Sequence, residues 1–174
     1  MYSENNALEN DDAPVEVVDA AGRPLAVLPA GEAHRQSLPH RAVLVLFFDA
    51  SGRLLLKKRP RDCDIYPDRW DAPARGHVRP GEAAQDAARR LADAARPGLA
   101  AQVLPARALE PSASTGFEVL SVFRCRIPPG TEAPDSGEMA VSSGEFEALI
   151  QDFRELFTPG LVHAFESGAL FRAP

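Results

Sequence analysis

Seven consecutive apolar residues, Ala42 to Phe48, restrict the fold of this chain more than any other segment. The run is too short to span a bilayer, and its unbroken apolar character is typical of a strand that is buried on both faces. Such a strand needs a packed layer on each side. Because 174 residues have room for one core, the sequence predicts a single α/β domain.

Turn, proline and capping signals predict the elements around this strand. Ser142 and Glu145 have the spacing of a capping box, Pro159 suits the first turn of a helix, and Pro73 argues against regular pairing over residues 70–78. We expect a frayed segment over residues 1–13, a domain over 14–174 and a polar connector over 30–39. The other expected strands are 15–19, 24–28, 53–58, 102–108 and 117–127, and the expected helices are 83–95, 143–153 and 159–166.

The net charge of −6 indicates that nucleic acid is not a partner, because an acidic surface repels phosphate backbones. The acidic residues near the start of the chain are unlike a signal peptide. Cys63 and Cys125 form neither a CxxC motif nor a disulfide framework, which favours reduced thiols. We therefore expect a cytoplasmic protein that does not bind membranes, and we leave open whether it forms a homodimer.

The stretch from Gly76 to Glu82, followed by a helix that carries Arg90, is the segment that most clearly indicates chemistry. Gly76 and Gly81 allow a loop to fold tightly against the start of this helix. Backbone N–H groups and the helix dipole favour anions at such a position. The segment therefore predicts a site for an anionic ligand such as a phosphate.

A glycine, five residues, a glutamate, seven residues and an arginine also form the first half of a Nudix box. This half-box, together with RAVLVLFFD (41–49), LLLKKR (54–59), YPDRWD (66–71) and FTP (157–159), resembles the branch of the Nudix hydrolase superfamily related to isopentenyl-diphosphate isomerase. The resemblance implies an α/β/α Nudix sandwich with a small mixed sheet, the box helix on one side and a C-terminal helix on the other. It also implies Mg²⁺ or Mn²⁺, which bridges the phosphates of a diphosphate substrate and activates water.

The second half of the box departs from the family pattern. Leu91, Ala94 and Ala95 stand where the family carries glutamates, so the helical carboxylates that bind metal are missing. Asp93 is offset from those positions and is expected to point away from them. Glu82 and Glu118 remain as the predicted metal ligands and catalytic carboxylates.

The resemblance to the isomerases implies a second metal site at His34, His40, His77 and Glu118. Imidazole nitrogens with one carboxylate suit a transition metal such as Zn²⁺, Mn²⁺ or Fe²⁺. The alternative is that these histidines are structural and bond to backbone carbonyls. Arg75 occupies the place of the isomerases' catalytic cysteine, and with a pKa above about 12 it cannot transfer protons.

Basic and aromatic residues near the box predict substrate contacts. Arg59, Arg75 and Arg79 would hold phosphate. Gly76 would allow a close approach of the backbone, and Trp70 would stack on a base or a prenyl chain. The alternatives are a solvated strand edge for the arginines and core packing for Trp70.

The sequence therefore predicts a metal-assisted Nudix-type hydrolase of a small diphosphate-containing substrate, such as a nucleoside diphosphate derivative. We expect its activity to be weakened because the box glutamates are missing. A catalytically inactive ligand-binding module is the alternative, and isopentenyl-diphosphate isomerase activity ranks third.

Overall fold

The predicted central strand is β3 (His40–Phe48) in the computed structural model, which describes residues 10–63, 65–130 and 137–171. Along its full length β3 pairs in parallel with β8 (Glu118–Arg126). Antiparallel partners of β3 are β1 (Pro14–Val18), β4 (Leu54–Lys58) and β6 (Ala74–His77). The mixed sheet is completed by β2 (Pro24–Pro29) on β1, β5 (Trp70–Asp71) and β9 (Glu138–Val141) on β4, and β7 (Val103–Leu109) on β8.

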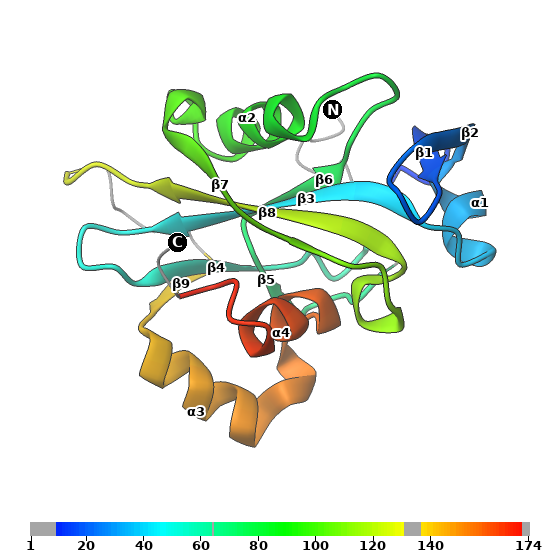
Figure 1. Ribbon diagram of the computed structural model, residues 1–174. Coiled ribbons are helices and arrows are strands. Elements are labelled where there is room, and N and C mark those ends of the chain that lie inside the picture. The colour runs from blue at the N-terminus through cyan, green and yellow to red at the C-terminus, as the bar shows by residue number, and fades with distance from the viewer. Residues whose placement is uncertain (1–9, 64, 131–136, 172–174) are drawn as a thin grey trace.

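Helices cover both faces of this sheet, as Figure 1 shows. On one face lies α2 (Ala84–Ala95), and on the other lie α3 (Ser143–Phe153) and α4 (Pro159–Glu166). Side chains alternate along β3, so that Val43, Val45 and Phe47 pack in the core under α2. Leu44 and Leu46 pack in the opposite core. The predicted α/β/α sandwich is confirmed.

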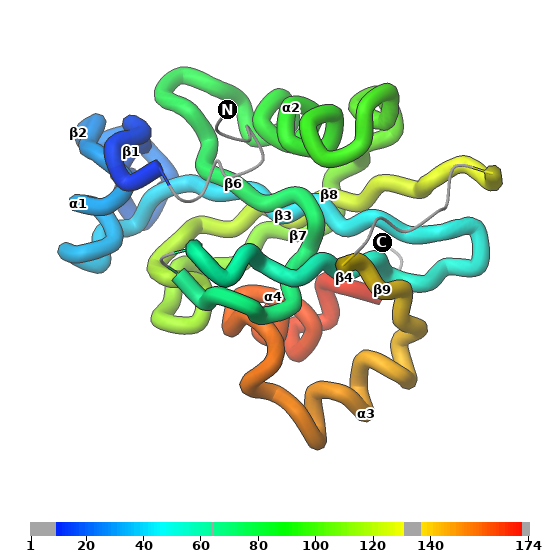
Figure 2. The backbone as a smooth tube through the Cα atoms, turned by 180° about the vertical axis from the view of Figure 1, so that it is seen from behind, coloured from blue at the N-terminus to red at the C-terminus, as the bar shows by residue number. Residues whose placement is uncertain are grey.

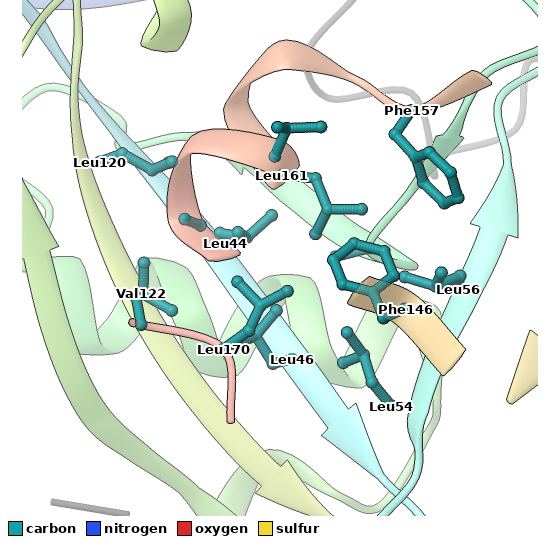
Figure 3. Packing of buried hydrophobic residues seen from close by; sticks show 14 of the residues in the cluster. Leu44, Leu46, Leu54, Leu56, Leu120, Val122, Phe146, Phe157, Leu161 and Leu170 are labelled. Atoms are coloured by element: carbon teal, nitrogen blue, oxygen red, sulfur yellow. The ribbon is translucent and has the colours of Figure 1, made fainter. Parts of the chain in front are cut away.

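The core beneath α3 and α4 is built from large apolar side chains (Figure 3). The ring of Phe146 on α3 packs against Phe157 with ring centroids 5.2 Å apart. The predicted capping box begins α3, because the Ser142 hydroxyl accepts from the Glu145 N–H and the Glu145 carboxylate accepts from the Ser142 N–H. Local sequence and burial therefore agree on where this helix begins and which face it buries.

The structure differs from the sequence expectation in the polar connector. Residues Ala30–Arg35 form a short helix, α1, because its first N–H groups bond to the Ala13 and Asp11 carbonyls and not to a side-chain cap. These long-range bonds give no local signal. Figures 1 and 2 both place α1 and the β1–β2 hairpin together at one end of the sheet. The predicted frayed segment falls largely on residues 1–9, which lie outside the described residues.

In the described part of the chain, three short 3₁₀ turns connect the larger elements: η1 (Ala100–Gln102), η2 (Ala113–Thr115) and η3 (Arg154–Leu156). Pro73 separates β5 from β6, as its sequence position indicated. Among the described residues, the helices are too short or too polar to cross a membrane.

Candidate metal centre

Strand register brings three candidate ligands to one face of the sheet. His40 on β3 lies opposite Glu118 on β8, and His77 on β6 lies opposite Ala42 on β3. Residues paired across neighbouring strands point to the same face, and residues two apart on one strand do so as well. His40, His77 and Glu118 therefore share the face that carries Leu44, at the end of the sheet where α1 adds His34.

The four side chains form a compact cluster, which we call the histidine cluster: His34, His40, His77 and Glu118. One ligand atom from each residue lies within 4.8 Å of the others. The imidazole centroids are 4.8 to 5.2 Å apart. His34 is half-buried and the other three residues are buried, so the cluster is largely shielded from solvent.

Backbone features at both strand starts orient the ligands. The Nδ1 atom of His40 is 2.8 Å from the Leu38 carbonyl, which turns its Nε2 atom toward the cluster. Gly116 and Phe117 both have left-handed backbone angles, with φ of 67° and 62°, directly before Glu118. Such a conformation is strained for phenylalanine and clusters at functional sites. Here it delivers Glu118 to the sheet face.

The protonation states suit metal binding. Burial lowers the pKa of His34 and lowers the pKa of His40 to about 4, so both imidazoles are neutral at pH 7. Burial alone would raise the pKa of Glu118, but the charge of Arg75 and the neighbouring His77 hold it at about 2. Neutral imidazoles and an ionised carboxylate are the forms that bind metal.

Unpaired polar atoms also fit a metal. Both ring nitrogens of His77 and the Nδ1 atom of His34 are buried and have no hydrogen-bond partner. Buried polar atoms without partners cost free energy, and a bound ion is one of the features that explain them. The donor set of three imidazoles and one carboxylate suits Zn²⁺, Mn²⁺ or Fe²⁺ better than Mg²⁺.

Acidification of the metal-free protein is expected to lower its free energy of unfolding. Because the pKa of His40 is about 4 when folded and 6.5 when exposed, the unfolded chain binds an extra proton between these pH values. Stability is therefore lost as the pH falls from 6.5 toward 4. His40 alone should remove about 2 kcal/mol between about pH 7.5 and pH 5, measured by urea unfolding with chelator present. An equal loss in His40→Gln would contradict this assignment.

Arg75 lies against the histidine cluster. Its Nη2 atom donates to the Glu118 Oε2 atom at 2.6 Å, and its Nη1 atom is 3.6 Å from the Asp71 Oδ2 atom. Only 10% of its side chain is exposed. Burial alone would lower the pKa of Arg75, but Glu118 and Asp71 raise it, so the guanidinium stays charged. Gly160 on α4 makes room for it, since a Cβ atom there would lie 2.8 Å from Nη1.

Comparisons with known proteins identify the family of this chain. The NUDIX domain model matches residues 38–93. The chain is 45% identical to an isopentenyl-diphosphate Delta-isomerase of Nocardia farcinica over 82 residues, and this match spans 46% of the chain and 47% of that protein, about half of its length. It is 34% identical to an isopentenyl-diphosphate Delta-isomerase of Burkholderia multivorans over 128 residues, which cover 71% of the chain and 72% of that protein. The chain belongs to the Nudix family.

A solved structure shares the Nudix fold of this chain. The crystal structure of DR0079 from Deinococcus radiodurans superposes with a TM-score of 0.72 and 19% identity, covering 88% of this chain and 98% of that chain. At this identity the likeness concerns the fold alone.

The Nudix box loop is held by ion pairing. Glu82 accepts two hydrogen bonds from Arg90 at 2.8 Å and one from the Arg79 N–H at 2.9 Å. Arg90 also donates to the His77 carbonyl at 3.2 Å. Arg90 thus links Glu82, just before the box helix, to the end of β6. It is not a member of the histidine cluster, the one candidate metal group among the described residues.

The positions of the missing box glutamates carry no ligands on α2. Leu91 is buried in the core under this helix, Ala94 is exposed and Ala95 is half-buried. Asp93 is exposed and accepts from the Gly98 N–H at 2.8 Å, so it stabilises the end of the helix. The box helix therefore packs against the sheet but supplies no carboxylate at the positions where the family pattern has glutamates.

Of the other predicted substrate contacts, Arg59 lies near Arg75 through Asp71, and the rest lie elsewhere. Arg59 is largely buried, with Nη1 at 3.7 Å from Asp71 Oδ2, whereas Arg79 is exposed. Trp70 is half-buried, packs against the core under α4 and lies beneath the Lys58 ammonium. Gly76 lies on β6 opposite Val43, on the α2 face.

A cleft of about 520 Å³ lies beside the first turn of α4. Its lining carries charges of both signs, because Arg69 and Arg154 face it together with Glu155 and Glu166, and Arg154 pairs with Glu166 at 2.5 Å; His163 lines it as well. Pro159 and Val162, on either side of the Gly160 that contacts Arg75, also line it. Sequence reasoning did not identify this cleft or the roles of Asp71 and Gly160, since only tertiary contacts bring these residues to Arg75.

Proposed function

We propose that this Nudix protein holds a divalent transition metal in the histidine cluster and hydrolyses a phosphoanhydride bond of a small diphosphate-containing molecule. The observation that carries the proposal is the convergence of four ligand atoms within 4.8 Å. The ionisation states of His40 and Glu118 support it, since neither needs to lose a proton at pH 7 to bind a metal.

The substrate class follows from the family and from charge. Relatives named isopentenyl-diphosphate Delta-isomerase act, by that name, on a diphosphate ester. A divalent metal when bound supplies Lewis acidity to a phosphoryl oxygen and to water. In the cleft beside α4, Arg69 offers a guanidinium to an anionic ligand, although the same cleft also carries Glu155 and Glu166.

Different residues of the histidine cluster and its surroundings would have different roles. His34, His40 and His77 would hold the metal through ring nitrogens, and the Leu38 carbonyl fixes the His40 ring. Glu118 is turned toward His77, with 3.6 Å between Oε1 and Nε2, while its other oxygen is held by Arg75. Because α2 lacks the box glutamates, we expect a slow reaction.

A binding module without catalysis is the second candidate. The ion pair of Glu118 with Arg75 favours it, because a carboxylate held at 2.6 Å by a guanidinium is a poor general base. Isomerase activity is disfavoured, since it needs an acid and a base on opposite faces of the substrate and Arg75 stays protonated.

Release of phosphate or of a nucleoside monophosphate from a panel of diphosphates tests the proposal. The panel contains nucleoside diphosphate derivatives and isopentenyl diphosphate, each with Mn²⁺, Zn²⁺ or Mg²⁺. We expect release with Mn²⁺ or Zn²⁺ that His77→Ala abolishes and that Glu82→Gln retains, because Glu82 lies outside the histidine cluster. Release that depends on Mg²⁺ and on Glu82 would instead favour a box-type metal.

The same panel separates the alternatives. A binding module would be stabilised against thermal unfolding by a diphosphate, with no hydrolysis product and no effect of chelator. An isomerase would convert isopentenyl diphosphate into its double-bond isomer and leave the diphosphate intact. Either outcome would contradict the proposed hydrolysis.

A further inference from the structure

The positively charged guanidinium of Arg75 lies next to Glu118, one of the proposed ligands in the histidine cluster. Its guanidinium is 2.6 Å from the Glu118 Oε2 atom, and both side chains are almost entirely buried. A divalent cation bound by Glu118 would therefore lie close to a guanidinium that its ion pairs with Glu118 and Asp71 keep charged. Like charges at such distances repel strongly in a protein interior.

Charged side chains of both signs surround Arg75. Arg75 lies 2.6 Å from Glu118 and 3.6 Å from Asp71, and Arg59 lies 3.7 Å from the same Asp71 oxygen. A divalent cation would add two positive charges beside this network, and uncompensated charge in a protein interior is costly.

The fold holds Arg75 in this place. Its backbone lies on β6, paired with Leu44 of β3, so the side chain must point to the face that carries the histidine cluster. On the other side, Gly160 leaves the space that the guanidinium fills, with 2.8 Å between Nη1 and the position of a Cβ atom. Arg75 therefore has little room to withdraw from Glu118.

We infer that Arg75 is an internal counter-ion of Glu118 that weakens divalent metal binding by the histidine cluster. The inference rests on the metal site of the proposed function. Arg75 and the metal compete for the charge of one carboxylate, whose Oε1 atom faces His77 and whose Oε2 atom stays with Arg75. A metal at this site would be bound more weakly, and its occupancy would depend on the free metal concentration.

Metal affinity of the full-length chain tests this role without using activity. Co²⁺ binding is followed by its visible absorption, and Zn²⁺ binding by competition, in the wild type and in Arg75→Gln and Arg75→Met. Removing the charge should lower the Kd at least about tenfold. Arg75→Lys keeps the charge and should stay within about threefold of the wild type. Arg59→Gln, whose guanidinium pairs with Asp71, should change the Kd less than Arg75→Gln does.

The outcomes separate the inference from the proposed metal site. Equal Kd values in all variants, or weaker binding by both neutral variants, would overturn the role of Arg75 and leave the metal site intact. No binding by any variant at millimolar metal would overturn both. Should Arg75→Gln be partly unfolded without metal, its intrinsic Kd is obtained by correcting the apparent Kd for the unfolded fraction, and an intrinsic Kd no lower than that of the wild type would overturn the inference.

Discussion

His77→Ala should weaken Zn²⁺ or Co²⁺ binding by on the order of 10²–10³-fold, because one of four ligands is lost from a site whose binding free energy they share. His77 is the ligand chosen for substitution because of its surroundings. Both of its ring nitrogens are buried without a hydrogen-bond partner, and its Nε2 atom lies 3.6 Å from the Glu118 Oε1 atom. Isothermal titration calorimetry or Co²⁺ absorption measures the change.

His163→Ala is the matched control for this prediction. His163 is the one histidine of the chain outside the histidine cluster and lines the cleft beside α4. Its removal should leave the metal Kd unchanged within about twofold. A similar loss of affinity in both variants would mean that metal binds at several histidines without a defined site.

Phe146→Ala should lower the free energy of unfolding by about 3–5 kcal/mol, the largest effect that we expect for a single substitution outside the site. The Phe146 side chain is fully buried, and its ring packs edge-to-face against Phe157 and Phe165 at 5.2 and 5.1 Å. Its removal leaves a cavity between α3, α4 and the sheet (Figure 3). The midpoint of thermal unfolding should fall by roughly 6–20 °C.

Phe153→Ala on the same helix is the control for packing. Its side chain is 48% exposed, so its loss should cost no more than about 1 kcal/mol. Urea unfolding of both variants gives the comparison. An equally small effect at Phe146 would contradict the packing of α3 on the sheet.

The fold was largely predictable because its strongest signals are local. The apolar run of β3, the capping box of α3 and the proline that begins α4 each specify an element without reference to distant residues. The exceptions are elements held by remote partners. α1 forms where Asp11 and Ala13 meet its first turn, and β9 forms because it pairs with β4.

The histidine cluster was predictable only through the family resemblance. No spacing rule connects His34, His40, His77 and Glu118, which lie on a helix and three strands and meet through strand register. The role of Glu82 was harder to predict from sequence, because a glutamate at a helix start can bind a metal or pair with an arginine. In the structure it pairs with Arg90.

The contacts of Arg75 lay beyond sequence reasoning altogether. The sequence showed that Arg75 stands in the place of the isomerases' cysteine. It did not indicate the ion pair of Arg75 with Glu118 or the space that Gly160 leaves for its side chain. Those contacts join residues separated by 43 and 85 positions in the chain. Only the assembled sheet, with α4 packed over it, brings them together.

The X-ray absorption spectrum of the zinc-loaded full chain tests the central claim most directly. It measures the atoms around the metal and their distances. We expect one zinc per chain with a first shell of three imidazole nitrogens at about 2.0–2.1 Å and at least one oxygen. A shell made of oxygens alone, or no stoichiometric zinc, would contradict a metal centre at the histidine cluster.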